Sequence, residues 1–109
     1  MTRPIDLAGK SGARYRYVPM EEERFLPLAG ANYVIAELTK DGARVVYAGE
    51  TDNLANQTWR PTLEQARQTY SKAKILTRLN VTRAVREAER IDLIQQYEPP
   101  LNSGSGNRA

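Results

Sequence analysis

The sequence predicts an α+β fold, in which a small antiparallel sheet of three strands is flanked by helices. Two runs rich in β-branched and aromatic residues, 33–38 and 45–47, are joined by the turn-forming pair Asp41-Gly42. A third run of this kind covers residues 74–79, and a long helix is predicted over residues 83–97. A hairpin and a separate strand, followed by a long helix, are typical of the α+β class.

The chain is expected to form a single domain over residues 13–102. Its 109 residues are close to the commonest domain size. Residues 1–12 are predicted to form a flexible arm, because they end in the run Gly9-Lys10-Ser11-Gly12. Residues 103–109 are predicted to form a disordered tail, because they are poor in apolar side chains. Arginine and tyrosine alternate within residues 13–18, which predicts an extra edge strand at the N-terminal side of the sheet.

Two helices are predicted between the hairpin and the third strand. Asp52 or Asn53 can cap the first, and Pro61 is expected to end it, because the residue before a proline is pushed out of the helical region. Thr62, with a glutamine three residues later, forms a capping box for a second helix over residues 63–72.

The composition limits the chemistry that this chain can perform. It has no cysteine and no histidine, so disulfides, thiolate zinc sites and histidine bases are excluded. Oxygen ligands for a hard cation such as Mg²⁺ remain possible. The formal net charge of +3 is compatible with a polyanionic partner. No apolar run approaches the length of a membrane span, and the start carries no hydrophobic signal segment, so we expect a cytoplasmic protein without membrane contact.

Several short segments lie in the order found in a known family. They are Ala-Asn-Tyr at 31–33, Tyr-Ala-Gly at 47–49, Glu-Thr-Asp-Asn-Leu at 50–54, Leu-Ile at 93–94 and Pro-Leu-Asn at 100–102. With this arrangement the chain resembles the GIY-YIG endonuclease superfamily, whose name describes two strands that each carry a tyrosine. The resemblance implies a GIY-YIG-like fold for the domain.

The resemblance also implies a site for phosphodiester hydrolysis. In active members, two tyrosines and a helix arginine surround the scissile phosphate. Tyr33, Tyr47 and Gly49 match the family pattern, but Gln57 stands where the arginine is expected. Arg60, three residues later, is the nearest candidate to replace it. Without the resemblance, Tyr33 and Tyr47 would be interpreted as half-buried strand tyrosines and Gly49 as a turn residue.

The second departure concerns the metal ligand. Active members carry a glutamate on the last helix that holds a divalent cation, but the matching position here is Arg90, which repels cations. Glu87 or Glu89 would have to bind Mg²⁺ if the domain were active; otherwise no cofactor is expected. Both glutamates have a simpler interpretation as solvated helix partners, Glu87 of Arg83 and Glu89 of Arg86.

The last predicted helix carries Arg83, Arg86 and Arg90 at a spacing that forms one stripe, and a phosphate backbone would balance their charges. The favoured function is therefore nucleic-acid binding, with DNA favoured over RNA, by a nuclease-like domain with an impaired site. Phage or mobile-element proteins, in which nuclease folds are reused, are compatible with this. The alternatives are an active Mg²⁺-dependent endonuclease and a protein-interaction or inhibitor module on the same fold.

Overall fold

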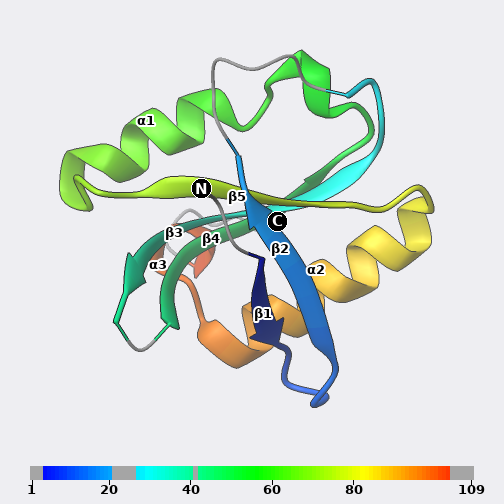
Figure 1. The fold of residues 1–109 in the computed structure, drawn as a ribbon, viewed down its shortest axis with the longest axis horizontal. Coiled ribbons are helices and arrows are strands. Elements are labelled where there is room, and N and C mark those ends of the chain that lie inside the picture. Colours follow the sequence, from blue (N-terminus) through cyan, green and yellow to red (C-terminus); the bar gives the residue numbers. More distant parts are fainter. Residues whose placement is uncertain (1–3, 21–26, 41, 104–109) are drawn as a thin grey trace.

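The computed structural model describes residues 4–20, 27–40 and 42–103 (Figure 1). These residues form one antiparallel sheet of five strands in the order β1-β2-β5-β3-β4. The strands are β1 (Ile5–Ala8), β2 (Arg14–Pro19), β3 (Ala31–Thr39), β4 (Gly42–Thr51) and β5 (Lys74–Leu79). The helices are the 3₁₀ turn η1 (Leu54–Asn56), α1 (Arg60–Thr69), α2 (Arg83–Tyr97) and α3 (Pro100–Ser103).

The α+β class is confirmed, but the prediction of three strands and one extra edge strand is wrong. The predicted flexible arm contains β1, which pairs with β2, so β2 lies inside the sheet and β1 forms its edge. Leu7 of β1 is only 3% exposed, and this burial holds the strand in place. Residues 1–3 of the predicted arm, and residues 104–109 of the predicted tail, lie outside the described residues.

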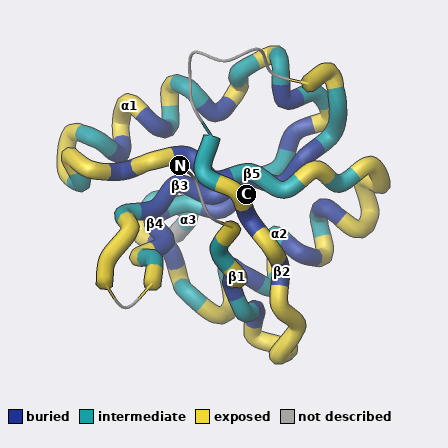
Figure 2. Tube along the Cα trace, in the orientation of Figure 1, coloured by how far each residue is buried: buried dark blue, intermediate teal, exposed yellow. Residues whose placement is uncertain are grey.

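The centre of the molecule is β3, which pairs with β4 on one side and β5 on the other. Because successive strand residues face opposite sides of a sheet, Tyr33 and Ile35 pack beneath α1, whereas Val34 and Ala36 face α2. Figure 1 shows α1 on one side of the sheet and α2 on the other. Figure 2 shows that buried positions are concentrated along the central strands.

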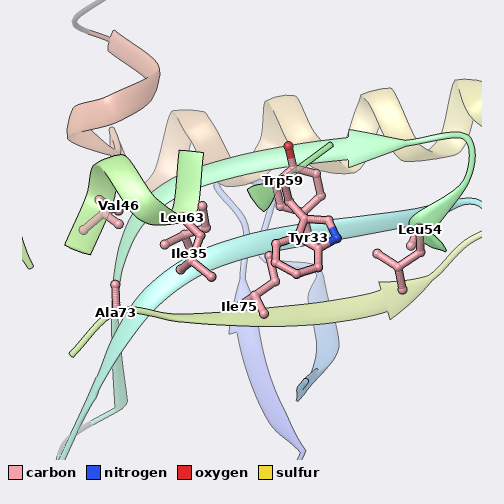
Figure 3. Close-up of a cluster of buried hydrophobic side chains, with 10 residues drawn as sticks. Tyr33, Ile35, Val46, Leu54, Trp59, Leu63, Ala73 and Ile75 are labelled. Atoms are coloured by element: carbon pink, nitrogen blue, oxygen red, sulfur yellow. The ribbon is translucent and has the colours of Figure 1, made fainter. Parts of the chain in front are cut away.

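The core on the α1 side is built around aromatic residues. Trp59 is fully buried, and Figure 3 shows it beside Tyr33, with Leu54 and Ile75 nearby. Tyr33, only 5% exposed, therefore belongs to this core, and its hydroxyl interacts with the side chain of Tyr47. The position of Tyr33 in the candidate site therefore depends on the packing of the core under α1.

The helix boundaries differ from the prediction in both segments between β4 and β5. The helix predicted over residues 63–72 is α1, Arg60–Thr69, so Thr62 lies within its first turn and does not cap it. The last helix, Arg83–Tyr97, and the strand Lys74–Leu79 have the predicted limits. The segment after Asn53 forms only the 3₁₀ turn η1, which Asn53 caps by accepting a hydrogen bond from the Ala55 amide at 3.1 Å. The next helix, α1, begins before Pro61, which lies in its first turn and therefore does not end a helix.

Within the described residues, no helix combines the length and the apolar character that crossing a bilayer requires.

Candidate functional site

Tyr33 and Tyr47 form a stacked pair on the α1 side of the sheet. Their ring centroids lie 6.0 Å apart with an interplanar angle of 29°. Gly49 is directly opposite Tyr33 in the β3–β4 register. A Cβ atom at Gly49 would lie 2.6 Å from Cζ of Tyr33 and 2.9 Å from Cε2 of Tyr47, so the pair can pack this closely only against a glycine. The structure thus brings together the three residues that match the family pattern.

Arg90 is close enough to this tyrosine pair to interact with it electrostatically. Burial raises the pKa of the Tyr33 phenol above its ordinary value, as do Tyr47 and the Glu50 carboxylate, while the positive charge of Arg90 lowers it. The charges of Tyr47 and Glu50 in turn help to raise the pKa of Arg90. Because β4 is an edge strand, side chains from the two sides of the sheet can meet around it. The charge of the Arg90 guanidinium therefore influences the ionisation of Tyr33 and is influenced by Tyr47.

Glu87 holds the Arg90 guanidinium from within α2. Nε of Arg90 donates to Oε1 of Glu87 at 3.1 Å, and Nη2 donates to Oε2 at 2.5 Å. This forked contact is the largest cause that lowers the pKa of Glu87 and raises that of Arg90. The predicted pair of Glu87 with Arg83 is replaced by this one, although the Arg83 charge also lowers the pKa of Glu87.

Arg86 does not belong to an exposed arginine stripe, and this part of the prediction is wrong. Its side chain is 3% exposed and pairs with Glu50 at 2.7 Å and with Asp52. Its Nη1 also donates to the carbonyl oxygens of Asn80 at 3.0 Å and Val81 at 2.8 Å. A guanidinium surrounded in this way cannot bind a phosphate, but it fixes Glu50 beside the tyrosines.

The side chain of Glu89 has different surroundings from that of Glu87, although both residues are on α2. It is 9% exposed, and its Oε1 accepts a hydrogen bond from Nε of Arg78 on β5 at 2.9 Å, so its predicted partner Arg86 is not the one it uses. Its negative charge is one of the causes that raise the pKa of Tyr17, after burial. The structure therefore assigns Glu89 to the core under α2 and separates it from the tyrosine pair.

Gln57 and Arg60 interact with each other. Gln57 has a left-handed backbone, with φ of 56°, and its Oε1 accepts a hydrogen bond from Nε of Arg60 at 2.9 Å. The Arg60 guanidinium also lies over the Trp59 ring at 4.8 Å. The turn at Gln57 interrupts the expected regular helix, so spacing along an ideal helix does not place these two side chains beside Tyr47.

Asparagine side chains fix the strands on both sides of the site, and the prediction from sequence assigned them no role of their own. Asn102 on α3 accepts from the Ala48 amide at 2.7 Å and donates to the Ala48 carbonyl at 3.0 Å, which occupies the free edge of β4. Asn32, fully buried, donates to the Arg86 carbonyl at 2.9 Å and accepts from Asn80 at 2.9 Å. Asn32 lies in the Ala-Asn-Tyr motif and Asn102 in the Pro-Leu-Asn motif. Their presence in these motifs was the only sign in the sequence of a structural role.

The residues around the tyrosine pair do not fit a divalent cation. Glu50 and Glu87 each already accept hydrogen bonds from an arginine, and the positive charge of Arg90, which interacts with Glu87, Tyr47 and Glu50, would repel a cation. Within the described ranges, no three acidic side chains gather where they could share a metal ion. We therefore derive no reaction step through a metal at this site.

In comparisons with known proteins, no family model, no curated protein and no solved structure matches this chain.

Proposed function

We propose that this chain is a GIY-YIG nuclease-like domain with an impaired catalytic site, and that it binds nucleic acid through a phosphate contact at Arg90. The observation that carries the proposal is the partly exposed guanidinium of Arg90, which interacts electrostatically with the phenols of Tyr33 and Tyr47. A cation at that position can offset the charge of a phosphate while the phenol hydroxyls donate hydrogen bonds to its oxygens. A cytoplasmic location, with access to nucleic acid, is part of the same proposal.

The order of the motifs along the chain supports the family part of the proposal. Tyr33 and Gly49 come from different motifs and are opposite each other in the sheet, and Asn102, from the last motif, is bonded to Ala48 in the second. Residues separated along the chain thus converge on residues 47–49 of β4, as expected if the motifs form a single site.

Binding without cleavage follows from the charges at this edge. Hydrolysis of a phosphodiester by this family's chemistry needs a metal to stabilise the leaving oxygen, and the site instead offers a fixed positive charge. A fixed guanidinium favours the bound phosphate but generates no nucleophile. The domain therefore retains nucleic acid and leaves the backbone intact.

The proposal is tested by fluorescence anisotropy with a fluorescein-labelled DNA duplex and its single strand. The chain should bind at low salt, and Arg90→Ala should weaken binding at least about tenfold, because a charge-assisted hydrogen bond contributes about 1.5–3 kcal/mol. The control is Arg14→Ala, which removes an exposed arginine on β2 and should leave the affinity unchanged. Glu87→Gln should tighten binding, because it releases the Arg90 guanidinium.

An Arg90→Ala variant with the affinity of the original chain would contradict the proposal. Failure of the original chain to bind DNA at low salt would favour a protein-interaction role. The observation that favours a protein-interaction role is the exposure of apolar residues such as Leu28, 82% exposed, and Val81, 86% exposed.

The endonuclease alternative makes an opposite prediction for the same proteins. If Glu87 served as a metal ligand, supercoiled DNA should be cut in the presence of Mg²⁺ or Mn²⁺, and both Glu87→Gln and Tyr47→Phe should abolish cutting. We expect no metal-dependent cleavage, since Glu87 is held by Arg90. Cleavage that depends on Tyr47 would replace the binding proposal with the enzymatic one.

A further inference from the structure

A β-bulge in β4 decides which side of the sheet Arg44 faces. Tyr47 is opposite Ile35, but Val45 is opposite the next residue, Ala36, so Val46 is an extra residue in β4. Val46 packs in the core under α1, and Val45 packs in the core under α2. Alternation then returns Arg44 to the α1 side, which is also the side of Tyr47. Without the extra residue, Arg44 would face α2 instead.

Arg44 on this side contacts the end of α1. Its guanidinium carbon lies 5.7 Å from the centroid of the Tyr70 ring, and Tyr70 caps the C-terminus of α1. Tyr70 and Tyr47 are both partly buried, and both pack against the same core cluster. Figure 1 shows the α1–β5 connection and the β3–β4 hairpin at the same side of the molecule. The surface beside the tyrosine pair therefore continues along β4 to Arg44.

Lys72 adds a second positive charge at this end. It is exposed and follows Tyr70 by two residues, in the short connection to β5. We name Arg44, Tyr70 and Lys72 the Arg44 surface. Glu37, directly opposite Arg44 in the register, offsets part of its charge. A surface that combines two cations with an aromatic ring is well suited to a nucleic-acid backbone.

The spacing also suits a phosphate backbone. A strand advances about 3.4 Å per residue, and Tyr47 and Arg44 are opposite Ile35 and Glu37, two residues apart on β3, so Arg44 is roughly 7 Å along the sheet from Tyr47. One strand of a DNA duplex places a phosphate about every 3.4 Å along the helix axis. The distance from the tyrosine pair to Arg44 is thus about two nucleotides of one strand.

We propose that the Arg44 surface is a second phosphate-binding site, on which the nucleic acid that contacts Arg90 continues past the tyrosine pair along the α1 side of β4. This inference rests on the proposed function and adds to it the direction in which the bound strand runs. The bulge at Val46 is the feature that puts Arg44 on the same side of the sheet as Tyr47.

The experiment measures DNA affinity against salt concentration, with the same labelled duplex and single strand, for the original chain and for the double variant Arg44→Ala with Lys72→Ala. On duplex DNA, the loss of two phosphate contacts should reduce the slope of log affinity against log salt by about 1.8; on a single strand the reduction should be about 1.4. Glu37→Gln should change affinity in the opposite direction, because it removes the carboxylate opposite Arg44.

The matched control is Arg14→Ala, a similar exposed arginine on β2, two strands away from β3 in the sheet order. Binding that is weakened by Arg90→Ala, but has the same salt slope in the double variant as in the Arg14 control, overturns this inference and leaves the proposed function intact. No binding by the original chain overturns both.

Discussion

The guanidinium of Arg86, 3% exposed, donates from Nε to Oε1 of Glu50 at 2.7 Å and thereby connects α2 to the end of β4. The same guanidinium reaches the carbonyls of Asn80 and Val81 after β5. Gly30 leaves room for it, since a Cβ there would lie 2.3 Å from Nη1. Arg86 therefore joins three elements and orients a carboxylate beside Tyr33, whose pKa that carboxylate helps to raise.

Removal of Arg86 should destabilise the fold strongly. In Arg86→Ala, Glu50 would lose its counter-ion and two carbonyl groups would lose their donor, so we expect a loss of about 3–5 kcal/mol in the free energy of unfolding. Urea denaturation followed by circular dichroism measures it. Arg83→Ala, the same change at an exposed position of α2, should stay within about 0.5 kcal/mol of the original chain. Equal effects of the two substitutions would show that the Arg86 contacts do not stabilise the protein.

Asn102 should contribute to stability through its two hydrogen bonds to Ala48. Each bond is expected to contribute about 0.5–1.5 kcal/mol, so Asn102→Ala should lower the free energy of unfolding by about 1–3 kcal/mol. The exposed Asn56, changed to alanine, is the control and should have a smaller effect. Hydrogen exchange provides a second measurement: the Ala48 amide should exchange faster in Asn102→Ala, and unchanged exchange would contradict the contact.

Stability should fall at alkaline pH. Burial is the largest cause that raises the pKa of Tyr15, Tyr17 and Tyr33 above the ordinary value of 10.0. A folded-state pKa above the unfolded one means that the folded state holds its proton more tightly, so the stabilisation is complete below pH 10 and is lost as the pH rises beyond it.

The measurement for this prediction is the phenolate absorbance during a pH titration, recorded with and without urea. The three phenols should titrate at higher pH in the folded chain than in urea, and Tyr33→Phe should remove one of the late-titrating groups. If all six tyrosines of the chain titrated together near pH 10 while it stayed folded, the prediction would be wrong.

Reversal of the charge at Arg90 should create a cation site. In Arg90→Glu, a third carboxylate would join Glu50 and Glu87, and their mutual repulsion should lower the melting temperature. Mg²⁺ or Mn²⁺ should then restore it in a concentration-dependent way, since a ligand that binds only the folded state stabilises it. Arg83→Glu is the control and should show no such response. An Arg90→Glu variant insensitive to both metals would mean that the glutamates do not converge.

The sequence by itself determined the features that depend on residues close to one another along the chain. The strand Lys74–Leu79 and the helix Arg83–Tyr97 follow from local propensity and from the prolines after Tyr97. The antiparallel pairing of β3 with β4 follows from their short connection. That connection alone would place Tyr33 opposite Ala48, and the extra residue Val46 shifts the register so that Tyr33 is opposite Gly49.

Only the tertiary structure decided which charged side chains remain available. The spacing of Arg83, Arg86 and Arg90 predicts a stripe on α2, but it does not reveal that acceptors from β4 and the chain after β5 converge on Arg86 alone. Desolvation of a guanidinium is favourable only where several such acceptors meet, and Glu50 lies 36 residues away along the chain. Arg90, one turn further along the same helix, pairs with Glu87 but is only partly buried, at 28% exposure, and still interacts electrostatically with Tyr47.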